Sequence, residues 1–171
     1  TNSKHNLMKK LFVEKLRKIT QNKKDIEREF DVKIFTYPNE GSVVINATPE
    51  KELIASQAIE AMNIGFSVND TIVLKAENFV FKRIDIKNYT KRADIIRVRA
   101  RLIGVKGRAL RTLESLTDCI IRMHENSVGI IGHEREIERA SQAVIRIIQG
   151  SPHANVYASL EKRSALEKQS F

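Results

Sequence analysis

The 171 residues of this chain suffice for one or two small domains, and 42% hydrophobic with 30% charged residues is typical of a folded globular protein rather than a disordered one. Lys and Arg number 30 against 21 Asp and Glu, and the resulting net charge of +9 is typical of proteins that meet polyanions. No apolar run approaches the roughly 20 residues of a membrane helix, and Thr1–Asn6 leads into no signal-type apolar segment, so we expect a cytoplasmic protein with no membrane partner.

Two stretches, residues 26–34 and 113–121, share the pattern of a helix end that runs directly into a strand. They lie 113 − 26 = 87 positions apart. Each is followed by a short apolar run, an acidic helix start and an apolar-striped helix that stops at a glycine, which suits a left-handed helix end. These paired features are residues 43–45 and 128–131, residues 49–52 and 134–136, and Gly65 and Gly150. The pattern predicts two copies of one unit.

Each copy is predicted to run strand, helix, helix, strand, strand, helix. Residues 65–75 are the expected linker, 79–86 the first strand of the second copy and 92–102 its first helix. Such a unit belongs to the α+β class, with a three-stranded sheet that carries its three helices on one face. A further helix is expected near the C-terminus, from Leu160 to Lys168.

The loop Gly104–Gly107, of sequence Gly-Val-Lys-Gly, lies between the two predicted helices of the second copy. Two glycines remove side chains, so that an RNA backbone can approach closely. The helix that follows offers unpaired N–H groups and a positive dipole end to a phosphate. Lys106 and Arg108 add positive charge beside that site. The loop is therefore predicted to bind the backbone of a nucleic acid.

Charge is concentrated around this loop. From Lys91 to Arg122 there are nine basic and three acidic residues, which gives +6 of the total of +9. A solvated helix usually mixes both signs, so this excess favours a nucleic-acid footprint. Candidates for the floor of an apolar groove are Ile103, Leu110 and either Ile121 or Met123, although each could equally be core. The predicted RNA-binding residues are Arg101, Ile103, Gly104, Val105, Lys106, Gly107, Arg108, Arg111 and Arg122.

The first copy lacks this loop sequence. Counting back 87 positions from the two glycines leads to Arg17 and Thr20, while Leu16 keeps the apolar position before the loop. Side chains at both glycine sites should block close approach of a backbone. We therefore expect the first copy to fold without clamping RNA in this way. Three roles remain open for the first copy: packing against the second copy, binding a protein, or contacting phosphates non-specifically through its basic residues.

The loop, its following helix and the next strand together resemble the type I KH domain, a single-stranded RNA-binding module. The resemblance implies a degenerate KH domain over residues 1–66, an intact one over 76–157 and a helical tail over 158–171. A KH domain holds about four nucleotides in a groove beside its Gly-x-x-Gly loop.

Several stretches resemble one KH group more closely, the archaeal ribosome-assembly proteins related to the eukaryotic partner-of-Nob (Dim-type) factor. This resemblance implies binding near the 3′ end of small-subunit ribosomal RNA during its maturation. It also implies two protein partners, an endonuclease that trims that end and the alpha subunit of translation initiation factor two. The stretches are residues 84–89, 101–108, 113–117, 127–132 and 150–157.

Other functions remain as alternatives. One is a general single-stranded RNA binder of the exosome-cap or messenger-binding type, and another is a protein-docking adaptor. An enzyme is disfavoured, because His133-Glu134-Arg135-Glu136 lacks the second His of a metalloprotease helix and the four His show no metal-ligand spacing with the lone cysteine. We expect no catalytic residues, metal or cofactor, and we expect Cys119 to be a small core residue.

Overall fold

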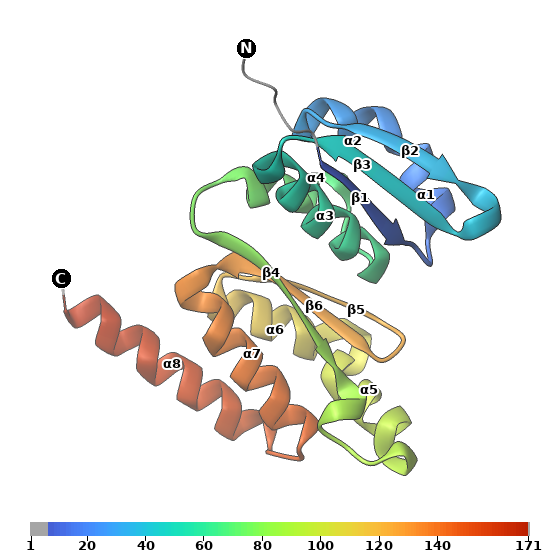
Figure 1. Ribbon diagram of the computed structural model, residues 1–171. Coiled ribbons are helices and arrows are strands. Elements are labelled where there is room, and N and C mark those ends of the chain that lie inside the picture. The colour runs from blue at the N-terminus through green and yellow to red at the C-terminus, as the bar shows by residue number, and fades with distance from the viewer. Residues whose placement is uncertain (1–6, 171) are drawn as a thin grey trace. The chain divides into compact units, whose positions relative to one another are not determined.

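The computed structural model describes residues 7–170 and divides into two compact units (Figure 1). The division falls between Phe81 and Lys82, within strand β4, Phe79–Asp85. Residues 1–6 of the expected first domain and residue 171 of the expected tail lie outside the described residues. Within the described part of the chain, no helix is long and apolar enough to cross a membrane.

The first unit is a three-stranded antiparallel sheet packed against helices, with strand order β1-β3-β2. The alternating exposure of β3 places Val43 and Ile45 in the core and Val44 and Asn46 on the other face. Ile19, Ile26 and Ile59 from the helices complete the core. Its elements are β1 Leu7–Phe12, α1 Leu16–Gln21, α2 Lys23–Phe30, β2 Lys33–Tyr37, η1 Pro38–Glu40, β3 Ser42–Ala47 and α3 Pro49–Ile64.

The expected linker, residues 65–75, is folded, so this prediction was wrong. Gly65 ends α3 with φ +118°, and the chain then forms α4, Val68–Thr71, and the 3₁₀ turn η2, Ile72–Lys75. Ser67 and Asp70 cap α4 reciprocally. Phe66 and Leu74 are buried. These apolar side chains hold the segment in the first unit because leaving them in water would cost free energy.

The second unit has the same kind of sheet, with strand order β4-β6-β5 (Figure 1). β6 is the central strand and is buried along nearly its whole length. Antiparallel sheets and packed helices in both units confirm the predicted α+β class. After β4 the elements are η3 Ile86–Asn88, η4 Arg92–Asp94, α5 Ile95–Ile103, η5 Val105–Gly107, α6 Arg108–Thr117, β5 Ile120–His124, β6 Ser127–His133, α7 Glu134–Ile148 and α8 His153–Gln169.

The 87-residue repeat recurs in atomic detail where a helix passes into a strand. Ile34 N–H donates to Glu27 Oε1 at 2.8 Å, and Ile121 N–H donates to Glu114 Oε1 at 2.8 Å. The residue that ends the helix is left-handed in both units, with φ 51° at Asp31 and 52° at Asp118. Both glutamates therefore satisfy a backbone donor that the edge strand leaves unpaired.

Helix α8 belongs to the second unit. It begins at His153, so the expected boundary at residue 158 falls inside the helix. Val156 and Leu160 are buried. The guanidinium of Arg139, which is itself buried on α7, donates to Leu160 O at 3.3 Å and to Ser164 Oγ at 2.9 Å. A buried guanidinium with several acceptors fixes the register of α8 on α7.

Candidate nucleic-acid interface

The loop between α5 and α6 has a defined backbone. Gly104 and Gly107 have φ +71° and +73°, and Lys106 is left-handed with φ 52°. Gly107 N–H donates to Gly104 O at 3.2 Å. The guanidinium of Arg111 donates through Nη1 to Lys106 O at 2.7 Å. The loop is thus held in shape before any ligand arrives.

The two glycines serve different purposes. A Cβ on Gly104 would lie 2.7 Å from Ala109 Cβ and 2.8 Å from Ala109 N. Gly104 is therefore required for the close packing of α5 and α6, a role that the sequence argument missed. A Cβ on Gly107 would meet only Nη1 at the end of the Arg111 side chain, at 3.2 Å. Position 107 favours glycine because its φ is positive, and this conformation leads the chain into the first residue of α6.

The first turn of α6 is open to an anion. No described side chain caps the helix, and its first turn holds no acidic residue. The positive dipole end of this helix therefore favours a phosphate. Val105 is 77% exposed, and Lys106 and Arg108 are exposed as well. Within the described residues, neither of these two cationic side chains forms a hydrogen bond or ion pair with another residue.

Two of the predicted arginines are engaged elsewhere. Arg101 donates through Nη1 to Ile147 O at 2.9 Å and through Nη2 to Ser151 O at 2.8 Å, so it holds the turn after α7. Arg122 donates through Nη1 to Glu114 Oε1 at 2.7 Å. Their charges are therefore partly committed to the fold, whereas Lys106 and Arg108 remain available at the loop.

The groove candidates separate into core and surface. Ile121 is 1% exposed and belongs to the core, whereas Ile103 is 36% exposed and Leu110 and Met123 are half-buried. Sequence reasoning missed Ile96, which is 83% exposed. It lies seven residues before Ile103 on α5, two helical turns away on the same face, and that spacing is the signal that could have found it.

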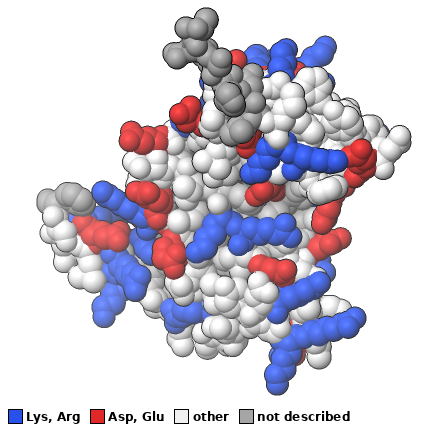
Figure 2. Space-filling model, in the orientation of Figure 1, with Lys and Arg blue, Asp and Glu red and all other residues white. Residues whose placement is uncertain are grey.

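Positive charge surrounds this surface. Figure 2 shows Lys and Arg side chains over the α5 end of the second unit, at the lower right, where little red is visible. Some of this charge is neutralised, since Arg97 pairs with Asp94 at 2.8 Å and Arg122 pairs with Glu114. Both arginines of those pairs are partly exposed, so an incoming phosphate can compete with the carboxylates.

The first unit has no corresponding loop. We expected Arg17 to Thr20 to occupy it, but these residues lie inside α1, and Asn22 alone joins α1 to α2. Without glycines nothing stops the helix there, and Thr20 Oγ1 donates to Leu16 O at 2.9 Å within it. Lys18 donates through Nζ to Phe66 O at 2.6 Å, and burial lowers the pKa of its ammonium group.

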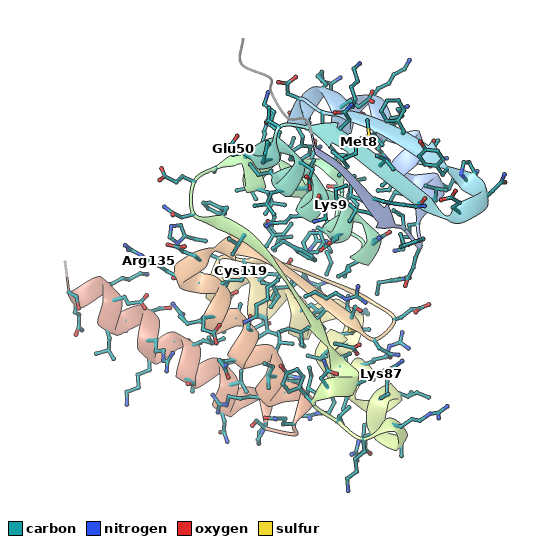
Figure 3. The ribbon with its side chains drawn as sticks, viewed as in Figure 1. Met8, Lys9, Glu50, Lys87, Cys119 and Arg135 are labelled. Carbon is teal, nitrogen blue, oxygen red and sulfur yellow. The ribbon has the colours of Figure 1, made fainter. Side chains whose placement is uncertain are left out.

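The prediction that Cys119 is a core residue is confirmed. Its side chain, labelled in Figure 3, is 4% exposed. A Cβ added to Gly132 would lie 2.4 Å from the Cys119 sulfur, so the two residues are closely packed. Burial raises the pKa of the Cys119 thiol from its ordinary value of 9.0 to about 11. A thiol that resists ionisation is a poor nucleophile, so this residue plays no part in the candidate site.

Comparison with known families identifies the fold of the second unit. A model of the eukaryotic-type KH domain (KH domain type I) matches residues 80–165, about half of the chain. This range includes the loop Gly104–Gly107 and extends into α8.

Individual relatives extend the similarity. A KH domain-containing protein of Methanocaldococcus jannaschii is 31% identical over 146 residues, 82% of this chain and 64% of the relative. The pre-rRNA-processing protein pno1 of Aspergillus oryzae is 28% identical over 66% of this chain and 45% of the relative. The chain thus spans less than two thirds of these relatives. A solved structure of the complex of Dim2p, initiation factor eIF2 alpha and rRNA from Pyrococcus horikoshii matches with a TM-score of 0.85 and 28% identity, over 94% of this chain and 96% of the matched chain.

Proposed function

The chain belongs to the type I KH-domain family, in the group of the pno1 and Dim2 proteins, and from that premise we propose that it binds single-stranded RNA through the loop Gly104–Gly107. The observation that carries the proposal is the uncapped first turn of α6 behind a loop whose backbone is already fixed. Such a helix start binds a phosphate without first having to reorganise.

The bound strand runs from this phosphate site along the groove that the KH resemblance implies beside the loop. Lys106 and Arg108 flank the phosphate, and Arg111 keeps the loop in place. Ile96, Ile103 and Leu110 offer an apolar surface to unstacked bases. The groove holds about four nucleotides, as in other KH domains. Arg101 and Arg122 contribute less than the sequence suggested, because both donate to protein acceptors.

The RNA that we propose is the 3′ end of small-subunit ribosomal RNA, and the process is subunit assembly with maturation of that end. Support comes from a relative named as a pre-rRNA-processing protein and from a similar structure solved as a complex with rRNA. The same complex contains eIF2 alpha, so the alpha subunit of initiation factor two is a proposed partner. The endonuclease that trims the end is proposed from the family resemblance alone.

The first unit is proposed to be a second, degenerate KH domain. Both units run β-α-α-β-β-α, apart from short turns and α8, and in both sheets the third strand is central. The helix-to-strand hydrogen bond of Glu27 recurs at Glu114. Because α1 and α2 are joined by one residue, the first unit has no loop to clamp a backbone. The protein acts by binding, with no catalytic step of its own.

Replacing Val105 and Lys106 by Asp tests the loop. We expect a loss of affinity of at least about tenfold, since two negative charges then face the phosphate and one positive charge is gone. Both glycines stay in place, so the α5–α6 packing is untouched. The measurement is fluorescence anisotropy with a single-stranded RNA from the 3′ end of small-subunit rRNA.

The matched control is Val105→Ser with Lys106→Asn, which changes the same two side chains without adding negative charge. It should lose only the contribution of one cation. Equal affinity of the Asp variant and the wild type would refute the loop as the binding site. A scrambled RNA that binds as tightly as the ribosomal one would favour the general RNA binder instead. RNA binding whose affinity does not change with salt concentration would favour the protein-docking adaptor.

A further inference from the structure

A pocket of about 470 Å³ lies between the loop and the start of α8. It is lined by Arg97 on α5, by Gly104 and Val105 of the loop, by Arg108 on α6 and by His153 and Tyr157 on α8. The apolar groove residues Ile96, Ile103 and Leu110 do not line it. The pocket is therefore distinct from the apolar surface that these three residues form, and the loop contributes to its wall.

The α8 wall of the pocket is a fixed aromatic surface. His153 and Tyr157 are one turn apart, and their ring centroids lie 5.9 Å apart at 64°. His153 Nε2 lies 2.9 Å from Arg101 O, and Arg101 is itself tied to the turn before α8. The rings are thus held in place while the pocket between them and α5 stays open. Fixed, partly exposed aromatic rings are the surfaces on which nucleic-acid bases stack.

The pocket is also cationic. Three arginines line it, and none of its lining residues in the described chain is acidic. Arg97 is largely exposed, and its one carboxylate partner, Asp94, is a residue of η4 outside the pocket. The side chain of Arg108 makes no hydrogen bond or ion pair within the described residues. An aromatic surface beside exposed Arg97 and Arg108 matches the chemistry of a nucleotide, because the rings suit the base and the guanidinium groups suit the phosphate.

The pocket is continuous with the phosphate site. Gly104, Val105 and Arg108 belong to both, so a strand whose phosphate rests on the first turn of α6 passes the mouth of the pocket. This continuity and the charge identify the occupant as RNA of the same strand rather than a separate protein segment.

We propose that this pocket is an additional nucleotide subsite, which takes the nucleotide next to the one held on the loop. Its base packs against Tyr157, and its phosphate lies between Arg97 and Arg108. The subsite lengthens the RNA footprint beyond the groove and makes α8 part of the RNA-binding surface. The inference rests on the proposed function, because it requires a strand on the loop.

The test uses the full chain and three synthetic RNAs. One is a tetranucleotide that fills the groove, and the others carry three more nucleotides on the 5′ or on the 3′ side. We expect one extended RNA to bind roughly tenfold more tightly than the tetranucleotide, the gain of about one stacked base. Tyr157→Leu should abolish that gain and leave the tetranucleotide affinity unchanged, which also shows that the variant is folded. Tyr157→Phe, which keeps the ring, should retain the gain.

Two variants that each remove one positive charge complete the test. Arg97→Gln should reduce the gain, whereas Arg135→Gln should not, since Arg135 is also an exposed arginine but lies on the first turn of α7, outside the pocket (Figure 3). A gain that survives Tyr157→Leu, or no gain from either extension, overturns the subsite. Wild-type affinity of the Val105→Asp, Lys106→Asp variant for the tetranucleotide would instead overturn the proposed function, so the two failures are distinguishable.

Discussion

Gly104 and Gly107 look alike in the sequence, but their surroundings differ. Gly104 touches Ala109 where α5 and α6 pack, so Gly104→Ala adds a clash to the strain of a positive φ. Gly107→Ala adds the φ strain and a contact that Arg111 can relieve by moving. We expect Gly104→Ala to destabilise the fold by about 2–4 kcal/mol and Gly107→Ala by about 1 kcal/mol. Urea unfolding of the two variants checks the order, and a larger loss at Gly107 would contradict it.

Cys119 gives the fold a predictable response to alkaline pH. Its folded pKa of about 11 exceeds the ordinary 9.0, so the folded state favours the neutral thiol. This stabilisation is fully present below about pH 9 and is lost as pH rises through about 11. The free energy of unfolding should therefore fall more steeply with pH in the wild type than in Cys119→Ala. Parallel pH curves would show that the thiol ionises as easily in the folded chain as in the unfolded one.

At the scale of elements, local sequence signals predicted most helices and strands in chain order. Three exceptions are instructive, and one of them is the loop expected at Arg17 to Thr20, which lies inside α1. The supposed linker is folded by Phe66 and Leu74, and its Ser67-x-x-Asp70 box was a signal that could have been used. The start of α8 was placed too late, which hid His153 and Tyr157 from the site analysis. No local pattern could have revealed the contact of Gly104 with Ala109, because that distance depends on how two helices cross.

The short connection between α1 and α2 leads to a prediction about restoring the two loop glycines in the first unit. Arg17→Gly with Thr20→Gly recreates the glycine spacing, but both positions lie inside α1. We expect no RNA binding and a loss of about 1 kcal/mol for each glycine placed in a helix. Gel-shift assays on a chain that also carries Val105→Asp and Lys106→Asp isolate the first unit. Recovery of RNA binding in that chain would show that glycine spacing alone makes a clamp.

At the scale of the whole molecule, charge and function coincide in one part of the sequence. The segment from Lys91 to Arg122 carries +6 of the net +9, and it contains the loop, both helices beside it and the first three residues of the edge strand β5. The sequence could locate this excess, but only the structure separates the arginines that hold the fold from the cations left for RNA. Arg101 and Arg111 donate to backbone carbonyls, whereas Lys106 and Arg108 do not. RNA affinity should accordingly depend more on Lys106 and Arg108 than on the total charge of the chain.

The central claim is that the first turn of α6 receives an RNA phosphate. Backbone amide NMR of the full chain, titrated with single-stranded RNA from the 3′ end of small-subunit rRNA, tests it most directly. The account predicts the largest shifts at the N–H groups from Val105 to Leu110, since these residues form the loop and the helix start at which the phosphate is proposed to bind. Shifts confined to the first unit, with the amides of 105–110 unmoved at saturation, would contradict it.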